Sequence, residues 1–434
     1  MKKPETERKS YVIDPPKFTK KMKKSYTIIA PDMLPYHFEV LKQIFIQHGY
    51  CVAVLKDEGK EVIDEGLKYV HNDTCYPALC VIGQFMRALK SGRYDVDKTA
   101  LIITQSGGGC RASNYIPLIR KALRTEYPQV PVLSINFSGL EKDNGVKIGI
   151  GMLLQLALGI FYADAVMSLY NQCKPYEAVQ GEADEARKDC MEFLAGIFKG
   201  KKYKRYEKNM RTILQRFSKV ERKAEKRIRV GIVGEIYVKY SPIGNSKLEE
   251  FLYNEGCEPV VPALMDFVMY CIVNNINDYT LYEKNKNTSF VYGLVYKYLL
   301  KKQRLAIRLF EEFGFEPPHD FEHLRACADK VLHQGVKMGE GWLIPAEMFA
   351  LCETGVTNVV CAQPFGCLPN HIVGKGASRT VKTIFPTANI VPIDYDASAT
   401  KVNRENRLKL MLETAREMEN ESVETLKEMA VTQE

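Results

Sequence analysis

Four cysteines stand in sequence settings that favour metal or redox chemistry: Cys75, Cys110, Cys361 and Cys367. A cysteine thiolate binds iron or zinc, and it also acts as a nucleophile. Cys75 lies in HNDTCYPALC, where turn-forming residues precede it and Pro77 suits the first turn of a helix. We therefore expect the Cys75 thiol at a helix N-terminus, where the helix dipole favours the thiolate.

Cys110 follows three consecutive glycines, Gly107, Gly108 and Gly109, in the segment TQSGGGCRASNY. Glycines let the backbone approach a bulky group, such as a phosphate or an iron–sulfur cluster, without Cβ clashes. This segment lacks the GxxxxGK(S/T) pattern of a phosphate-binding P-loop, so that type of site is not expected. An ordinary tight turn between a strand and a helix is the alternative interpretation.

Cys361 and Cys367 share the segment NVVCAQPFGCLPNHI. We expect Cys361 to close a strand and Cys367 to lie in an irregular loop, because two prolines and a glycine interrupt the pattern. Five residues separate the two cysteines, and this spacing is a weak metal signature by itself. Cysteines that follow separate parallel strands would meet at one edge of a sheet, where α/β proteins place their functional loops.

Three interpretations of these cysteines remain open from the residues alone. They could hold an iron–sulfur cluster, they could be buried structural residues, or one could be a nucleophile with His71 or His371 as its base. The other eight cysteines carry no such signal. Cys173 is expected in a loop, and the rest are expected in the hydrophobic core: Cys51, Cys80, Cys190, Cys257, Cys271, Cys327 and Cys352.

The composition is that of a globular protein with a large core, 46% hydrophobic and 26% charged over 434 residues. The net charge of +8 gathers in residues 2–24 and 199–229, which we interpret as a solvated tail and helix. An anionic ligand such as coenzyme A is the alternative, whereas no motif indicates a nucleic-acid partner. The apolar stretch 148–163 is short for a membrane span, and we predict a buried helix there. Without a signal peptide, a cytoplasmic location is expected.

Short apolar runs alternate with helical patterns and predict a parallel sheet built from βαβ units. Strands are expected at 25–30, 51–55, 100–106, 130–136, 229–238, 258–263, 358–363 and 389–396. The predicted fold class is α/β, with two doubly wound parallel-sheet domains joined by helices. The predicted division is a basic tail (1–24), a first α/β domain (25–145), a helical connector (146–227), a second α/β domain (228–420) with a helical insertion at about 265–337, and a polar frayed tail (421–434).

At these segments the sequence resembles the 2-hydroxyacyl-CoA dehydratase superfamily, and most of all the cysteine-rich C-terminal portion of the large acyl-CoA dehydratase activase-related proteins. The matching segments are HNDTCYPA (71–78), GGGCRASNY (107–115), VGIVGEIYVKYSPIGN (230–245), GEGWL (339–343), CAQPFGCLPNHI (361–372) and NIVPIDYDASATKVNRENRLKLM (389–411). The resemblance implies a 4Fe–4S cluster held between two α/β domains by cysteine thiolates.

Carried over to this chain, the resemblance assigns Cys75 and Cys110 as ligands from the first domain. Cys361 is the preferred ligand from the second domain, with Cys367 as a fourth ligand. A double-cubane cluster would need more cysteines, and only Cys80 and Cys352 stand remotely near, so it is not expected.

The implied function is low-potential electron transfer or reductive dehydration of an acyl-CoA-like substrate through a ketyl radical. Glu235 and Glu347 are the candidate acid/base residues. The ATP-binding domains of the activase-related proteins are missing here, so an ATP-dependent activase of the actin and sugar-kinase type is expected as a separate chain. A dimer is also expected, as in the dehydratases. The alternative is a non-catalytic electron-transfer or scaffold partner of the activase: four cluster ligands would favour it, and three would favour substrate chemistry.

Overall fold

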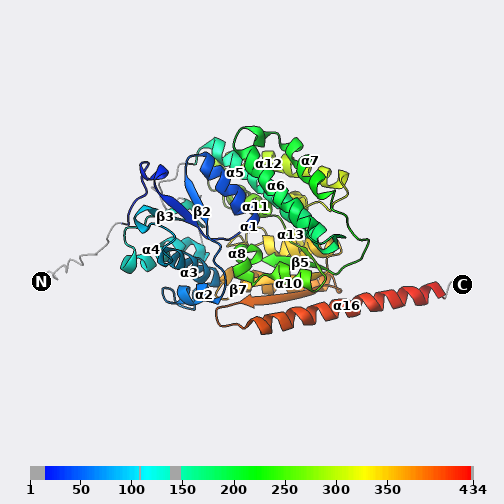
Figure 1. Ribbon diagram of the computed structural model, residues 1–434. Coiled ribbons are helices and arrows are strands. Elements are labelled where there is room, and N and C mark those ends of the chain that lie inside the picture. The colour runs from blue at the N-terminus through cyan, green and yellow to red at the C-terminus, as the bar shows by residue number, and fades with distance from the viewer. Residues whose placement is uncertain (1–14, 107–108, 137–147, 432–434) are drawn as a thin grey trace.

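The computed structural model describes residues 15–106, 109–136 and 148–431, with side chains up to residue 420. Two four-stranded, all-parallel sheets form its framework (Figure 1). The first has the order β2-β1-β3-β4, made of β2 (Cys51–Val54), β1 (Thr27–Ala30), β3 (Thr99–Gln105) and β4 (Val132–Asn136). The second has the order β6-β5-β7-β8, made of β6 (Glu258–Val260), β5 (Arg229–Gly234), β7 (Asn358–Pro364) and β8 (Asn389–Tyr395). The predicted α/β fold with two parallel sheets is confirmed.

The two sheets have the same topology, so their strand order reverses at equivalent pairs of strands. The strand order reverses between β1 and β3 in the first sheet and between β5 and β7 in the second. Loops that follow the strands at such a reversal diverge and leave room for a ligand. Cys110 follows β3, Glu235 follows β5 and Cys367 follows β7, so the topology brings three of the predicted residues to these two points.

Helices cover both faces of each sheet. The helices of the first domain are α1 (Pro35–Gln47), α2 (Lys60–Leu67), α3 (Tyr76–Lys90) and α4 (Tyr115–Glu126). The connector consists of α5 (Ile150–Cys173), α6 (Glu182–Phe198) and α7 (Tyr206–Phe217). The second domain has α8 (Ile236–Tyr240), α9 (Pro242–Asn245), α10 (Leu248–Asn254), α14 (Leu343–Glu353), α15 (Gly376–Ile384) and α16 (Lys401–Val431). Between β6 and α14 lie the inserted α11 (Leu264–Tyr282), α12 (Lys286–Glu312) and α13 (Phe321–Val331).

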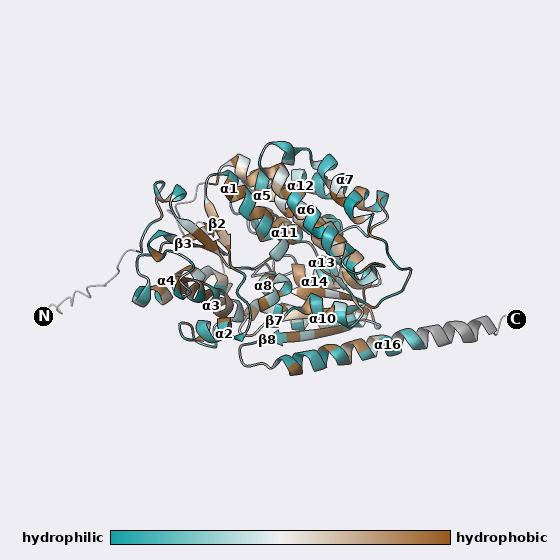
Figure 2. Cartoon of the chain, viewed as in Figure 1, coloured by the Kyte–Doolittle hydropathy of each residue, from teal (hydrophilic) through white to brown (hydrophobic). Residues whose placement is uncertain are grey.

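Among the boundaries that differ from the sequence prediction, two have a clear structural consequence. The strand expected over 229–238 ends at Gly234, because Glu235 caps a helix there with its own side chain. The tail predicted to fray from residue 421 continues as helix α16 to Val431, which runs along β8 and projects past the edge of the sheet (Figure 1). Its residues are mostly hydrophilic, whereas β2, β3 and α14 carry hydrophobic residues (Figure 2).

The hydrophobic core joins the two domains. One apolar cluster contains Ile29 and Leu101 from the first sheet together with Val230 and Val360 from the second, all fully or almost fully buried. Shared burial of this kind fixes the two sheets relative to each other, because separating them would expose apolar surface to water. A site built between the two domains can therefore have a fixed geometry.

Helix α5 is the predicted buried helix. Within the described part of the chain it is the one segment, Ile150–Tyr176, that is long and apolar enough to cross a membrane, and 61% of its most apolar window is buried inside the protein. It packs against α1, α6, α7 and α11. This burial is that of a core helix in a soluble globular protein.

Candidate functional site

Three of the predicted cysteines begin helical segments in loops of the two domains. Cys75 is the N-cap of α3, and Cys110 is the N-cap of a short 3-10 helix, Arg111–Asn114, that leads directly into α4. Cys367 directly precedes a helical segment that starts at Leu368. The predicted helix starts at Cys75 and Cys110 are confirmed. Backbone N–H groups at helix starts favour negatively charged groups such as thiolates.

The loop that carries Cys367 lies directly on the loop that carries Cys75. The backbone N–H of Tyr76 donates a hydrogen bond of 3.1 Å to the carbonyl of Phe365. Gly366 has φ +76°, and a Cβ atom there would lie 3.3 Å from both the N and the Cα of Cys75. A glycine is therefore needed both for the backbone conformation and for the close approach of the second domain to the first.

Contacts of Tyr115 and Met338 place the Cys110 loop beside the loops of Cys75 and Cys367. The Tyr115 hydroxyl and the Cys75 Sγ are 3.0 Å apart, a hydrogen bond in the buried interior. On the other side, a Cβ on Gly109 would lie 2.6 Å from the Met338 Sδ, so the Cys110 loop packs against the segment that leads to Glu340. The loops of Cys75, Cys110 and Cys367 thus meet between the two sheets. We call these three residues, with Glu235 and Glu340, the cysteine site.

Two carboxyl groups at the cysteine site act on each other and on the thiols. Burial, followed by the charge of Glu340, raises the pKa of Glu235 to about 8. Glu340 also has a raised pKa because of burial, although its Oε1 accepts from the Ile236 N–H (3.1 Å) and its Oε2 from the Asn370 Nδ2 (3.2 Å). Two neighbouring buried carboxyls cannot easily both be charged, so the pair holds a proton near neutral pH.

The three thiols are protonated in the metal-free protein. Burial is the main cause: it raises the pKa of Cys75 to about 11 and that of Cys110 to about 12, and it also raises the pKa of Cys367. The charge of Glu235 adds to this effect at all three thiols. Free thiols of this kind are poor nucleophiles at neutral pH, whereas a bound metal would supply the positive charge that stabilises the thiolates.

The donor atoms described at the cysteine site do not form a compact set for a single metal ion. Among the described residues, no three ligand atoms of His, Cys, Asp or Glu at the cysteine site lie within 4.8 Å of one another, as ligands of one ion would. In a cluster each thiolate binds a different iron, so wider spacing is required. The Asn370 Nδ2 lies 3.4 Å from the Cys367 Sγ, and hydrogen bonds to sulfur are one of the means by which proteins set cluster potentials.

Cys361 lies away from the cysteine site, and its predicted position at a strand end is wrong. It sits in the middle of β7, paired with Val233 and Pro392 of the neighbouring strands, and it is fully buried. Its side chain belongs to the apolar cluster formed with α14, and its Sγ lies 3.4 Å from the Gln363 Nε2. β7 ends at Pro364, three residues after Cys361. The cysteine that lies in the loop after this strand is therefore Cys367.

Glu347 also lies outside the cysteine site. Its carboxylate accepts hydrogen bonds of 2.8 and 3.0 Å from the Lys239 Nζ, and both side chains are 2% exposed. This buried ion pair joins α14 to α8 and leaves the carboxylate no access to a ligand at the cysteine loops. Glu235, the other predicted acid/base residue, is at the site. Of the three predicted glycines, Gly109 packs as described above, and Gly107 and Gly108 lie outside the described residues.

The two histidines considered as bases lie near carboxylates, and the His71 Nδ1 accepts a hydrogen bond from the Asp73 backbone N–H. His71 is exposed and its Nδ1 lies 3.3 Å from an Asp73 oxygen, and the His371 Nδ1 lies 3.9 Å from an Asp394 oxygen. Among the described contacts, neither histidine is paired with a thiol, so the nucleophile interpretation has no base to support it.

Two cysteines expected in the core, Cys51 and Cys271, are exposed.

Sequence reasoning missed Glu340 and Tyr115 as members of the site. Glu340 stands in GEGWL, where both flanking glycines have positive φ, +58° at Gly339 and +32° at Gly341. A charged residue held between two such glycines was the available signal, because positive φ favours glycine and marks a tightly built turn. Tyr115 stands in the quoted segment GGGCRASNY, but an aromatic residue at the start of a helix carries no signal of a bond to a distant thiol.

A groove opens beside the cysteine loops between the two domains. Its volume is about 580 Å³, and its walls include His71 and Asp73 before Cys75, Phe365 before Cys367, and Asp396 after β8. Neither a protein-family model nor a curated protein matches the chain. What the cysteine site does must therefore be argued from its own geometry and from the sequence motifs.

Proposed function

We propose that this protein holds a 4Fe–4S cluster at Cys75, Cys110 and Cys367 and works as an iron–sulfur protein of the 2-hydroxyacyl-CoA dehydratase type. The observation that carries the proposal is the meeting of these three cysteine loops from both domains around Glu235 and Glu340. Such a cluster, when bound, supplies low-potential electrons. The reaction would be electron transfer or reductive dehydration of an acyl-CoA-like substrate.

The side chains around the thiols have distinct parts in the proposed function. Tyr115 hydrogen-bonds the Cys75 sulfur and Asn370 the Cys367 sulfur, and both contacts would stabilise negative charge on the sulfurs. Glu235, whose pKa is raised to about 8, can hold or accept a proton near neutral pH, as a general acid or base must. Glu340 keeps that pKa high through its own charge and positions Asn370 through a hydrogen bond.

The number of ligands favours substrate chemistry over simple electron transfer. Three cysteines lie at the site, whereas the fourth predicted ligand, Cys361, is fully buried in the apolar cluster that β7 forms with α14. A cluster with three cysteine ligands has one iron without a protein thiolate, which is the arrangement that substrate chemistry requires. The second candidate, a non-catalytic electron carrier or scaffold, would need a fourth protein ligand.

The proposal extends to location and partners. All twelve cysteines, each of them among the described residues, are free thiols, which suits a reducing compartment such as the cytoplasm. The proposed electron donor is a separate ATP-dependent activase of the actin and sugar-kinase type, and the proposed assembly is a dimer. Copurification of an activase under anaerobic conditions, with ATP-dependent reduction of the cluster, tests this part.

The decisive experiment is anaerobic purification or reconstitution, followed by iron and sulfide analysis and by EPR spectroscopy of the dithionite-reduced protein. We expect about four irons and four sulfides per chain, and a loss of the EPR signal in Cys75→Ala, Cys110→Ala and Cys367→Ala. Cys361→Ala is the matched control, since it removes a buried thiol from the same strand region and should keep the signal. Absence of iron and sulfide in the reconstituted protein would refute the proposal, and loss of the signal in Cys361→Ala alone would refute the ligand assignment.

A further inference from the structure

A second group of metal-ligand side chains lies where α13 packs against α14, at the end of α14 that is remote from Glu340. The His323 Nε2 and the Glu353 Oε2 are 2.6 Å apart, the Cys327 Sγ lies 3.4 Å from the same nitrogen, and it lies 3.9 Å from the same oxygen. These three atoms form the one set of His, Cys, Asp or Glu ligand atoms in the described residues that lies within 4.8 Å of one another.

Regular helix geometry brings the three side chains together. His323 and Cys327 are four residues apart on α13, so they lie on one face of the helix, one turn above the other. Glu353 is the last residue of α14, and α13 and α14 pack against each other along their length. A helix C-terminus carries partial negative charge, so the position of Glu353 favours a cation.

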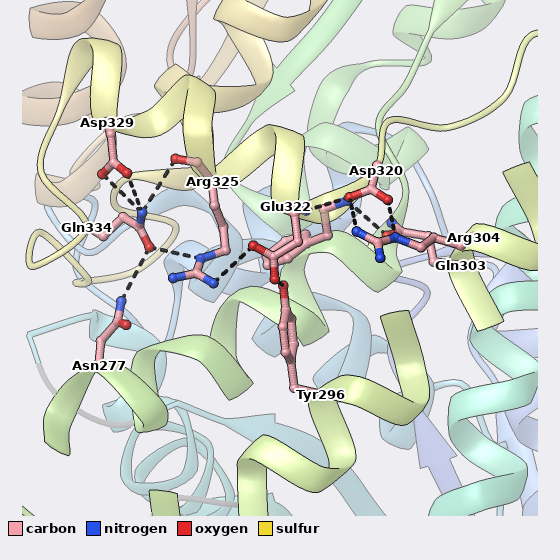
Figure 3. A network of polar contacts seen from close by, with 10 residues as sticks. Asn277, Tyr296, Gln303, Arg304, Asp320, Glu322, Arg325, Asp329 and Gln334 are labelled. Carbon is pink, nitrogen blue, oxygen red and sulfur yellow. Dashed lines mark hydrogen bonds and ion pairs between the residues drawn. The ribbon is translucent and has the colours of Figure 1, made fainter. Parts of the chain in front are cut away.

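A polar network on the other side of α13 fixes the helix in place (Figure 3). Asp320 caps its first turn and binds Arg304 of α12, while the Gln303 Oε1 accepts from the Phe321 N–H. Further along, Glu322 accepts from Tyr296 of α12 and from Arg325. These contacts tie α13 to α12 and leave the face with His323 and Cys327 toward α14.

The distances match a tetrahedral zinc site after one small adjustment. With zinc–ligand distances of about 2.0–2.3 Å, a tetrahedral arrangement places sulfur about 3.6 Å from a nitrogen or oxygen ligand, and nitrogen about 3.4 Å from oxygen. The two distances from the Cys327 Sγ, 3.4 and 3.9 Å, bracket the required value. The His323–Glu353 distance of 2.6 Å is a hydrogen bond, and it must lengthen by about 0.8 Å.

Charge and access also suit a cation. Glu353 brings a carboxylate to the group. Its Oε1 contacts the Lys330 Nζ at 3.3 Å, which leaves Oε2 for another partner. Cys327 is fully buried, whereas the side chains of His323 and Glu353 are 43% and 34% exposed, so the group is open to solvent on one side.

We propose that His323, Cys327 and Glu353 bind a Zn²⁺ ion through the Nε2, Sγ and Oε2 atoms, with a water molecule in the fourth position. The ion would replace the hydrogen bond between His323 and Glu353 and pin the inserted helix α13 to α14 of the second domain. The ion binds the thiolate form of Cys327, so the thiol proton is released to solvent on binding. This site is independent of the proposed iron–sulfur cluster.

The test is a Zn²⁺ titration of the anaerobically purified full chain against a metallochromic chelator, together with thermal denaturation. We expect the wild-type chain to bind one equivalent more than His323→Ala, Cys327→Ser and Glu353→Gln. Zinc should also raise the melting temperature of the wild-type chain by more than that of these variants. His333→Ala, which removes an exposed histidine from the loop after α13, is the matched control and should behave as wild type. Zinc bound at Cys75, Cys110 or Cys367 is common to all five chains and cancels in the comparison.

Equal zinc capacity in the wild-type chain and Glu353→Gln would overturn the proposal. Glu353 is a partly exposed ligand, so this variant should fold even where Cys327→Ser, at a fully buried position, does not. Loss of the equivalent in His323→Ala with full retention in a folded Cys327→Ser would also overturn it, because the thiolate is then not a ligand. The EPR signal of the reduced protein should be the same in all these variants.

Discussion

Gly366 offers the sharpest test of whether the two domains must touch at Cys75 to make a site. A Gly366→Ala substitution has two effects that the structure separates. The backbone has φ +76°, where a residue with a Cβ costs about 1–2 kcal/mol in the left-handed region. The new Cβ would also lie 3.1 Å from the Asp73 carbonyl oxygen and 3.3 Å from the N and Cα of Cys75, so the two loops must move apart by a few tenths of an ångström.

Gly92→Ala is the matched control for the backbone effect. Gly92 has φ +70° and no atom within 4 Å of a Cβ built on it. It lies just beyond the C-terminal end of α3, about 22 Å from Cys75 at the other end of the helix. Both variants should lose about 1–2 kcal/mol of stability from backbone strain, and Gly366→Ala should lose about 1 kcal/mol more through overpacking.

The assay compares urea denaturation with iron content after anaerobic reconstitution. We expect iron content to fall in Gly366→Ala and to stay at the wild-type value in Gly92→Ala, because only the first substitution moves a cysteine loop. If the two variants lose the same stability and keep the same iron, the contact between the Cys75 and Cys367 loops does not hold the site together, and the reasoning fails.

Three further predictions concern buried charge and thiol chemistry. Lys239→Met should destabilise the protein by about 3–5 kcal/mol in urea denaturation, because it leaves the buried carboxylate of Glu347 unpaired. The double variant Lys239→Met/Glu347→Leu should recover most of that loss of stability. Equal losses in the single and double variants would contradict the ion-pair argument. The pKa of Glu235 is raised from its ordinary value of 4.5 to about 8, so the folded protein binds the extra proton, and the stability of the metal-free wild-type chain should fall as pH rises from about 4.5 to 8. Glu235→Gln should flatten that fall in denaturation midpoints measured at pH 5.5 and 8.5, and an unchanged slope would show that the carboxyl is not protonated in the folded state. Burial raises the pKa of the Cys110 thiol to about 12, so iodoacetamide at pH 7.5 should modify the exposed Cys51 faster than Cys110 in the metal-free protein. Peptide mass spectrometry measures both labelling rates. Faster labelling of Cys110 would restore the nucleophile interpretation.

The sequence by itself determined the framework and two of the three cysteine positions. Each of the eight expected strands is present, because a buried parallel strand is a short apolar run that can be recognised without its neighbours. The helix starts at Cys75 and Cys110 were also readable, since Pro77 and the residues before each cysteine are local signals. Such features depend on residues a few positions apart in the chain.

The tertiary structure decided what those positions are next to. Cys361 lies in the middle of β7 and points into the apolar cluster beside α14, whereas Cys367 lies in the loop because β7 ends at Pro364. Pairing with β5 and β8 sets both the extent of β7 and the direction of its side chains. Glu340 and Glu347 are seven positions apart in the chain, but Glu340 lies at the cysteine site and Glu347 pairs with Lys239. The four-residue spacing of His323 and Cys327 is visible in the sequence, but the approach of Glu353 is not. Contacts between residues distant in the chain arise only when the helices and sheets pack, so no local pattern records them.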